Sequence, residues 1–398
     1  MTAEAIPKIH TDDLPMPEAR DEAWLIVGRS PIVELEDGYA VTTRDLVETV
    51  LKDPATFSSK KAFDVLASPV PLVPIAFDPP QQTRYRQILQ PFFSPRAIKP
   101  LEPELRRQII KIIEPITARG RCEFIAEVAG VFPIQVFLTL FGLPLDMRDQ
   151  FIEWKNAVLS LASASGSVTT DEEAASKGLQ KAAELFMYLS ELIQTRRGQQ
   201  GDDVLTRVLN LQPPHALTDE EAIGLCFLFV LAGLDTVMDA LGFGMQRLAE
   251  NPGKRQEIID DPTLIPAATE ELLRLDPPAP FVPRVTTKET TIGDLTCSAG
   301  TRVTNYLAVA NRDESEFPNP YAIDFHRADN RHISFGMGAH RCLGSHLARL
   351  EMNIVYEEWH KQIPHYHITP GTTPRVHWPR GTVGLESLHL TLEGPVAQ

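Results

Sequence analysis

One segment near the middle of the chain restricts the possible folds more than any other. Thr218 and Glu221 have the spacing of a capping box, which marks the start of a helix. The helix is expected to run for about 30 residues and to end near Pro252, because proline cannot continue it. The residues around its middle are apolar on nearly all sides, so this helix must be buried. A buried helix of this length requires a large, mainly helical domain around it.

The rest of the chain contains no internal repeat and no low-complexity linker that would divide it. Helical periodicity dominates from about residue 82 to residue 275, and one more helix is expected after Cys342. Short strand-like segments bounded by turn residues are expected at 31–35, 39–43, 284–287, 290–292, 301–305 and 386–392. The sequence therefore predicts one domain over residues 1–398, mainly α, with a smaller β region to which both ends of the chain contribute.

Charge and cysteine content disfavour several classes of function. The net charge of −15 disfavours nucleic-acid binding, which depends on clustered Lys and Arg. The four cysteines include no pair with zinc-site or CxxC spacing, and they are too few for a disulfide scaffold. Residues 1–20 lack the apolar core of a signal peptide. The apolar run 222–234 is shorter than the ~20 residues that span a bilayer. We therefore expect a reducing, cytoplasmic location and no membrane anchor.

Residues 335–344 read Phe-Gly-Met-Gly-Ala-His-Arg-Cys-Leu-Gly and precede a predicted helix. The glycines allow the backbone to turn and to approach a flat group closely. A helix that starts just after Cys342 points its positive end at the sulfur and favours the thiolate, which backbone N–H groups can also stabilise. Phe335 would cover the sulfur with an apolar ring. Cys342 is therefore a candidate metal ligand, the alternative being an inert buried cysteine in a glycine-rich turn.

This segment resembles the ligand loop of the cytochrome P450 family, Phe-Gly-x-Gly-x-His-x-Cys-x-Gly, and matches it at every specified position. The resemblance implies that Cys342 is the axial thiolate ligand of haem b and that His340 donates a hydrogen bond to a haem propionate. Phe335, Gly336 and Gly344 would then contact the cofactor. A thiolate ligand pushes electron density that favours O–O cleavage. The implied fold is a triangular, helical haem domain with a long central helix.

The middle of the buried helix reads Ala232-Gly233-Leu234-Asp235-Thr236. An acid and an alcohol are costly in an apolar interior unless they are paired or functional, and glycine within a helix costs about 1 kcal/mol relative to alanine. The segment resembles the P450 signature that lies above the iron. There Ala232 and Gly233 would make room for dioxygen, Thr236 would hydrogen-bond it as it is reduced, and Asp235 would relay protons from solvent. The alternative is a kinked helix with a back-bonded threonine.

Several other charges match positions of the same family. Glu271 and Arg274 lie three residues apart on one predicted helix face and match the family's structural Glu-x-x-Arg pair. Arg284 and Arg86 match arginines that bind the haem propionates, for which charge-assisted hydrogen bonds are well suited. Many relatives have His where this chain has Gln82, whose amide can still donate a hydrogen bond.

The resemblance covers nearly the whole chain and is closest to the bacterial camphor-hydroxylase-like group of P450s. The camphor enzyme has a Tyr that binds the substrate ketone where this chain has Val70, so camphor itself is not the expected substrate. It also has an acid near a propionate where this chain has Val282, so we expect a haem edge more open to solvent. The pocket candidates are nearly all apolar, which suits a compact terpenoid or norisoprenoid-like substrate, although each one is equally compatible with simple core packing. They are Phe63, Val70, Leu72, Val73, Leu228, Leu231, Ala232, Phe281, Val282, Thr382 and Val383.

No reductase domain is recognisable in the sequence, so two electrons are expected from a 2Fe–2S ferredoxin with its ferredoxin reductase. Arg86, Arg341 and Arg349 form a candidate docking cluster, at which binding would be salt-sensitive. The predicted function is hydroxylation of a small hydrophobic substrate with dioxygen. One alternative is another reaction of the same haem, such as desaturation, epoxidation or peroxide-driven oxidation, and the Asp235–Thr236 pair favours dioxygen over peroxide. The other is a non-catalytic haem protein that senses or carries a ligand, which would have no need of that buried pair.

Overall fold

The computed structural model describes residues 6–63, 70–164, 172–378 and 381–393. Helices account for 53% of the structure and strands for 11%, which confirms the mainly α class. The helices are α1 (Arg20–Val27), α2 (Arg44–Lys52), α3 (Gln81–Leu89), α4 (Pro95–Ile98), α5 (Glu102–Arg119), α6 (Phe132–Leu140), α7 (Arg148–Ala164), α8 (Glu172–Arg196), α9 (Val204–Leu209), α10 (Asp219–Glu250), α11 (Pro252–Asp260), α12 (Ile265–Leu275), α13 (Leu307–Ala310) and α14 (Ser345–Gln362).

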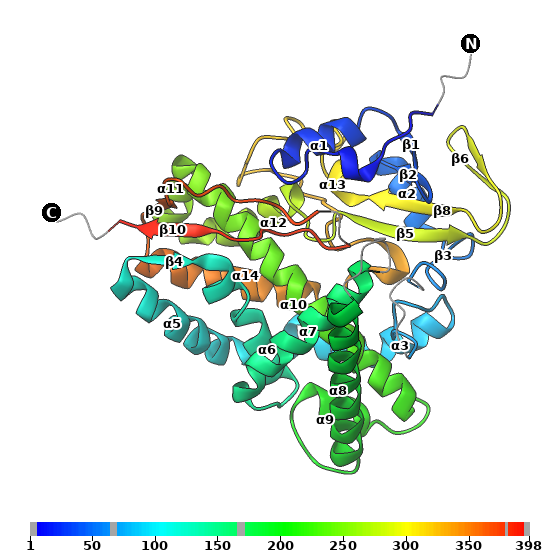
Figure 1. Ribbon diagram of the computed structural model, residues 1–398, viewed down its shortest axis with the longest axis horizontal. Coiled ribbons are helices and arrows are strands. Elements are labelled where there is room, and N and C mark those ends of the chain that lie inside the picture. Colours follow the sequence, from blue (N-terminus) through cyan, green and yellow to red (C-terminus); the bar gives the residue numbers. More distant parts are fainter. Residues whose placement is uncertain (1–5, 64–69, 165–171, 379–380, 394–398) are drawn as a thin grey trace.

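The long central helix predicted from the capping box is α10. The Thr218 hydroxyl accepts a hydrogen bond from the Glu221 backbone N–H at 3.2 Å, and the Glu221 carboxylate accepts one from the Thr218 N–H at 2.8 Å. Although α10 is long and apolar enough to cross a membrane by length and composition, 61% of its most apolar window is buried inside the fold. It crosses the middle of the molecule and packs against α6, α8, α12 and α14 (Figure 1). Gly244 permits the contact with α14, because a Cβ there would lie 1.9 Å from the Tyr356 hydroxyl.

Within the described residues, the strands form three sheets. The largest has the order β1-β2-β8-β5-β3, in which β1 and β2 form the predicted hairpin and β2 pairs in parallel with β8. The C-terminal strand β10 pairs with β4 and β9, so both ends of the chain contribute strands, as expected, but to different sheets. The five-stranded sheet and the β4-β10-β9 sheet lie at different ends of the helical body (Figure 1). The strands are β1 (Ile32–Leu35), β2 (Gly38–Val41), β3 (Phe57–Ser58), β4 (Arg121–Glu123), β5 (Phe281–Thr286), β6 (Thr290–Ile292), β7 (Leu295–Cys297), β8 (Arg302–Tyr306), β9 (Tyr366–Ile368) and β10 (His389–Leu392).

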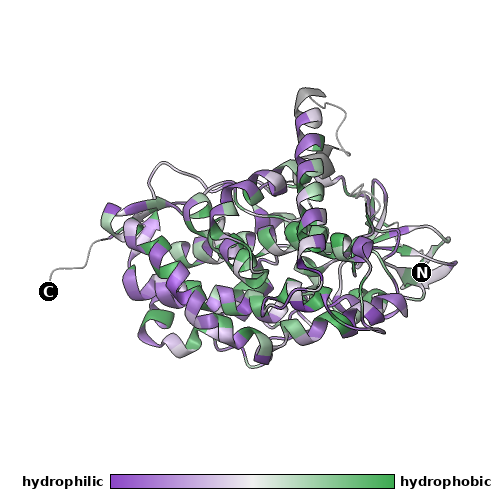
Figure 2. Cartoon of the chain, turned by 90° about the horizontal axis from the view of Figure 1, so that it is seen from below, coloured by the Kyte–Doolittle hydropathy of each residue, from purple (hydrophilic) through white to green (hydrophobic). Residues whose placement is uncertain are grey.

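One hydrophobic core draws its side chains from most of the described chain, from Leu14 to Leu390. A smaller cluster, which includes Val41 and Val303, lies under the five-stranded sheet. The helices carry both hydrophobic and hydrophilic residues (Figure 2), as expected of helices with one face on the core. Burial of these apolar faces holds α10 and the segment around Cys342 in fixed positions.

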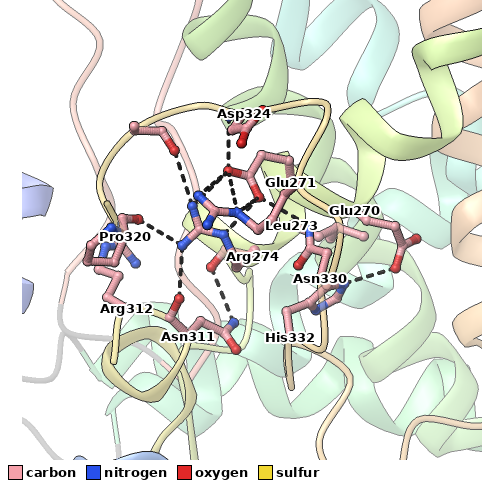
Figure 3. A network of polar contacts seen from close by, with 12 residues as sticks. Glu270, Glu271, Leu273, Arg274, Asn311, Arg312, Pro320, Asp324, Asn330 and His332 are labelled. Carbon is pink, nitrogen blue, oxygen red and sulfur yellow. Dashed lines mark hydrogen bonds and ion pairs between the residues drawn. The ribbon is translucent and has the colours of Figure 1, made fainter. Parts of the chain in front are cut away.

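A buried polar network joins α12 to the chain that leads to Cys342 (Figure 3). Arg274 donates to both carboxylate oxygens of Glu271 at 2.8 Å, and neither side chain is exposed. The same guanidinium donates to the carbonyls of Asn311 and Pro320 at 2.9 and 2.7 Å. Glu271 also accepts the backbone N–H of Asp324 at 3.1 Å. The pair named from the sequence therefore clamps residues 311–324 against α12.

Candidate active site

The loop that carries Cys342 is held by backbone hydrogen bonds. The Cys342 N–H donates to the Phe335 carbonyl at 2.7 Å, and the Gly336 N–H donates to the Ile333 carbonyl at 2.8 Å. Helix α14 begins three residues after the cysteine, with Gly344 at its N-cap. Cys342 is the exposed one of the four cysteines, and it faces a large cavity inside the protein. The loop thus presents its sulfur to a space that the protein encloses.

Two glycines of this loop adopt backbone angles that other residues avoid. Gly336 and Gly338 have φ angles of +66° and +67°. At Gly338 a Cβ would also lie 2.4 Å from the Leu51 carbonyl oxygen of α2, which cannot move away without breaking the helix end. The glycine pattern seen in the sequence is therefore required by close backbone contact at position 338 and by backbone conformation at both positions.

Opposing influences act on the Cys342 thiol. Burial raises the pKa of the thiol, whereas a hydrogen bond from the Gly344 N–H and the positive charges of Arg86, Arg349 and Arg341 lower it. Burial outweighs these groups, so the pKa of Cys342 is raised, although the loop surrounds the sulfur with groups that stabilise an anion.

The edge of the same cavity carries positive charge that has no carboxylate partner. Arg86 and Arg284 line the cavity and, within the described residues, neither forms an ion pair with an acid within 4 Å. Arg86 donates to the Arg341 carbonyl at 2.8 Å, and Arg284 donates to the Pro283 carbonyl at 2.7 Å. Burial lowers the pKa of Arg284 to about 10. The buried guanidinium of Arg284 and the half-buried one of Arg86, which donate here only to carbonyls, form a suitable site for an anionic group.

His340 belongs to this cationic edge. Its Nε2 atom is buried and has no hydrogen-bond partner among the described residues. Burial, together with the positive charges of Arg284 and Arg86, lowers the pKa of His340 to about 4. Gln82, which is 1% exposed, also lines the cavity and donates its amide N–H to the Ala339 carbonyl. Part of the donor capacity predicted for Gln82 is thus used within the protein.

Helix α10 forms another wall of the cavity. Ala232, Gly233 and Thr236 line it, and a Cβ placed on Gly233 would meet no atom within 4 Å. The Thr236 hydroxyl donates to the Ala232 carbonyl at 2.9 Å, which is the back-bonded arrangement considered as the alternative from the sequence. The hydroxyl oxygen retains its capacity to accept a hydrogen bond from the cavity side.

Asp235 points away from this wall and is paired. Its carboxylate forms a buried ion pair with Lys155 of α7, and the two residues are 8% and 5% exposed. The positive charge of Lys155 offsets the free-energy cost of burying the Asp235 carboxylate in an apolar helix. The acid and the alcohol predicted to act together therefore lie on different sides of α10, with Thr236 at the cavity and Asp235 against α7.

The cavity brings together most of the residues named from the sequence. Those on its wall are Phe63, Gln82, Arg86, Leu228, Ala232, Gly233, Thr236, Val282, Arg284, Phe335, Gly336, His340, Cys342 and Gly344. A thiol, a helical glycine with open space beside it and a cationic edge thus border one largely apolar cavity.

A family model described as cytochrome P450 matches residues 39–358. The chain belongs to the cytochrome P450 family. It is 34% identical over 332 residues to a probable cytochrome P450 127A1 of Sinorhizobium fredii, covering 82% of this chain and 77% of that protein. It is 32% identical to a vitamin D(3) 25-hydroxylase of Pseudonocardia autotrophica, covering 74% and 71%. The solved structure of cytochrome P450 CREJ in complex with (4-ethylphenyl) dihydrogen phosphate superposes with a TM-score of 0.85 at 27% identity, covering 93% and 96%.

The chain is accordingly a P450 monooxygenase with haem b as its cofactor. The observed residues fit that group. The free His340 Nε2 and the two arginines without carboxylate partners match an anionic propionate edge, and the open space above Gly233 leaves room beside α10. The P450 fold expected from the sequence is confirmed by the superposition.

Other pocket candidates lie in the core beside the cavity and not on the wall described above. Leu72 and Val73 are 2% and 1% exposed, and Val70 is 8% exposed. This segment packs on α10 at Gly224, where a Cβ would lie 2.1 Å from the Pro71 carbonyl oxygen. The remaining candidates that the structure places off this wall are Leu231, Phe281, Thr382 and Val383.

Sequence reasoning missed three features of the P450 site. Lys155 gave no signal, because its partner is 80 residues away. Glu351 of α14 lines the cavity, and its buried Oε2 has no hydrogen-bond partner among the described residues. Burial raises the pKa of Glu351 well above its ordinary value. The sequence signal for Glu351 was an acid between two apolar residues, Leu350 and Met352, of a predicted helix. The third feature is a group of aromatic wall residues, Phe93, Phe137, Phe141 and Phe229.

The three arginines named as a docking cluster have different roles in the structure. Arg341 is exposed. Arg86 lines the cavity, and Arg349 forms an ion pair with Glu270. Only Arg341 of the three is an exposed side chain without an ion pair within the described residues.

Proposed function

We propose that this P450 uses Cys342 as its haem ligand and hydroxylates a small apolar molecule of the terpenoid or norisoprenoid type. The observation that carries the proposal is that Cys342, Thr236 and the cationic edge of His340, Arg86 and Arg284 border one cavity. Haem bound there would supply dioxygen activation with two electrons and insertion of one oxygen atom. We further propose that residues 1–398 form one domain, which the continuous core supports.

The chain's own residues divide the work around that cavity. His340 and the two arginines bind and orient an anionic edge. Thr236 offers a hydroxyl at the α10 wall, and Asp235, on the other side of α10, relays protons from solvent once its ion pair with Lys155 opens. This acid–alcohol pair supports a monooxygenase over a sensor or carrier. Relatives named as hydroxylases support the same choice.

The substrate class follows from the wall. Its residues include Phe93, Phe137, Phe141, Phe229 and Val282, and few polar groups on it are able to recognise a polar substrate. The resemblance to the camphor-hydroxylase-like group stays part of the proposal, while the relatives named above are other bacterial P450s. In that group a tyrosine that binds a ketone stands where this chain has Val70. We therefore propose a compact hydrocarbon-rich substrate other than camphor.

The electron donor we propose is an acidic 2Fe–2S ferredoxin with its reductase, in the cytoplasm. Arg341 beside the ligand loop is the exposed cation that would contact it. Such docking is fast and weakens with salt. Arg341→Gln should therefore raise the ferredoxin concentration needed for half-maximal reduction and should reduce the salt dependence. An unchanged salt dependence would contradict this docking site.

The first test is the absorbance difference spectrum of the reduced protein with and without carbon monoxide. Wild type should show the strongly red-shifted Soret band of a thiolate-ligated haem, and Cys342→Ala should lose it. Cys122→Ala, which removes a buried cysteine in β4, is the matched control and should keep it. Loss of the band in both variants or in neither would refute ligation by Cys342.

The second test addresses substrate and reaction. A norisoprenoid, a monoterpene and a macrolide are titrated into the ferric protein, and the Soret band is followed. The two small ligands should shift the band, and the bulky macrolide should not. With a ferredoxin system, Thr236→Ala should retain the carbon monoxide band but form about tenfold less product per NADH consumed, as expected for loss of a group that positions protons. Equal yields would refute the role of Thr236.

A further inference from the structure

A charged network lies behind the Cys342 loop. Arg349 of α14 donates to the two carboxylate oxygens of Glu270 on α12, at 2.5 and 2.7 Å. The Nε2 atom of His332 lies 3.0 Å from the same carboxylate, as drawn in Figure 3. The His332 side chain is 1% exposed, whereas those of Arg349 and Glu270 are 23% and 28% exposed. The Arg349–Glu270 pair is therefore partly shielded from water. Two hydrogen bonds from Arg349 and the contact with His332 hold the Glu270 carboxylate in place.

The network touches the loop through one aromatic ring. The guanidinium carbon of Arg349 lies 4.3 Å from the centre of the Phe335 ring, within cation–π distance. Phe335 lines the cavity, and its carbonyl accepts the Cys342 N–H at 2.7 Å. The ring of His332 lies 6.0 Å from the same phenylalanine ring. The Arg349 guanidinium thus contacts Phe335, the residue whose carbonyl holds the Cys342 N–H.

The Arg349–Glu270 pair is oriented with its positive end towards the Cys342 loop. Glu270 binds the guanidinium while Phe335 packs against it, so a positive charge is held against the loop and its counter-charge belongs to α12. Exposed Arg341 has no such anchor. A cation held near an anionic ligand stabilises whichever state of the site carries more negative charge. For a thiolate-ligated iron this is the reduced state, because it carries one more electron.

We propose that Arg349 is a positioning residue that raises the reduction potential of the iron held by Cys342, acting through Phe335 while Glu270 and His332 hold it in place. This inference rests on the proposed ligation by Cys342. Arg349 touches neither substrate nor the reacting atoms, so its effect is on the electron-accepting step. Removing the Arg349 charge should make electron transfer from a ferredoxin to the iron less favourable without altering the cavity wall.

The test is a potentiometric titration of the haem-loaded protein, in which the ferric and ferrous fractions are read from the Soret band. Arg349→Gln removes the positive charge and should raise the ferric-to-ferrous ratio at a fixed solution potential about threefold to tenfold, tenfold being 59 mV for one electron. Glu270→Gln removes the opposing negative charge and should shift the ratio in the other direction. Arg331→Gln is the charge-matched control, because Arg331 is 73% exposed and its ion pair with Asp329 is a loose one of 3.6 Å.

Opposite shifts in the two variants would support the proposal, because general damage to the loop would move both in one direction. Shifts of the same sign, or a shift in Arg349→Gln no larger than in Arg331→Gln, would overturn it. If Arg349→Gln does not fold, the sign of the Glu270→Gln shift relative to the Arg331→Gln control decides. The carbon monoxide band is recorded for each variant. Its absence in the wild type would refute ligation by Cys342, whereas its presence with unchanged potentials would refute only the role of Arg349.

Discussion

The buried pair of Glu271 and Arg274 offers a stability prediction that the structure makes quantitative. Replacing Arg274 with Met keeps a long apolar stem but removes the guanidinium (Figure 3). That group makes two bonds to Glu271 and donates to the carbonyls of Asn311, Pro320 and Ala322. Both members of the pair are 0% exposed, so water does not replace the lost donors without local opening.

The expected cost follows from what is left unpaired. Removing one partner of a buried ion pair typically costs about 3–5 kcal/mol, because the remaining charge is uncompensated. Arg327 and Asn330 continue to contact Glu271 and reduce that cost. Against this, the backbone carbonyls of Asn311, Pro320 and Ala322 lose a donor, at up to about 1 kcal/mol each. We therefore expect Arg274→Met to lower the free energy of unfolding by about 4 kcal/mol, with loss of the haem-loaded form at lower urea concentration.

Urea unfolding of the haem-loaded protein at pH 7, followed by tryptophan fluorescence, measures this change. Arg375→Met is the matched control, since the Arg375–Glu18 pair is 56% and 58% exposed and should contribute only about 0–1 kcal/mol. The double variant Glu271→Gln, Arg274→Met should recover part of the loss, because it removes the uncompensated carboxylate. If Arg274→Met is no less stable than Arg375→Met, the network does not clamp residues 311–324.

Three further predictions concern the site. Gly338→Ala should lower haem occupancy, measured by the ratio of Soret to protein absorbance, because its Cβ would meet the Leu51 carbonyl at 2.4 Å and alanine disfavours a φ of +67°; full occupancy would contradict this. Lys155→Met should destabilise the fold by about 3 kcal/mol by leaving Asp235 buried without its cation, and Asp235→Asn in the same background should restore part of the loss in urea unfolding. Burial opposes ionisation of Glu270, but hydrogen bonds from its cationic partners outweigh it and lower its pKa from 4.5 to about 2. Its stabilisation is then complete above pH 4.5 and is lost as the pH falls towards 2, so the stability gap between wild type and Glu270→Gln should shrink below about pH 4.5.

The parts of this P450 that could be predicted from its sequence are those specified by local chemistry. The start and end of α10 were predictable because Thr218 and Glu221 cap each other within one turn and Pro252 follows the last turn. The Cys342 loop was predictable because its glycines, histidine and cysteine lie within ten residues. The cationic edge was identified through the family resemblance, which supplied positions that composition alone would not single out.

What only the tertiary structure decided are contacts between residues far apart in the chain. The sequence offered Val70, Leu72 and Val73 as apolar pocket candidates, but their segment packs closely on α10 at Gly224 and lies in the core. The sequence placed Asp235 in a buried helix, and the fold supplied Lys155 as its partner. Likewise, the role of Arg349 depends on Glu270 and Phe335 meeting it from two other segments. Local sequence patterns indicate which side chains must be buried and where the backbone must turn. Which partner each one meets is determined by packing, because ion pairs and close contacts depend on distances in space and not on spacing along the chain.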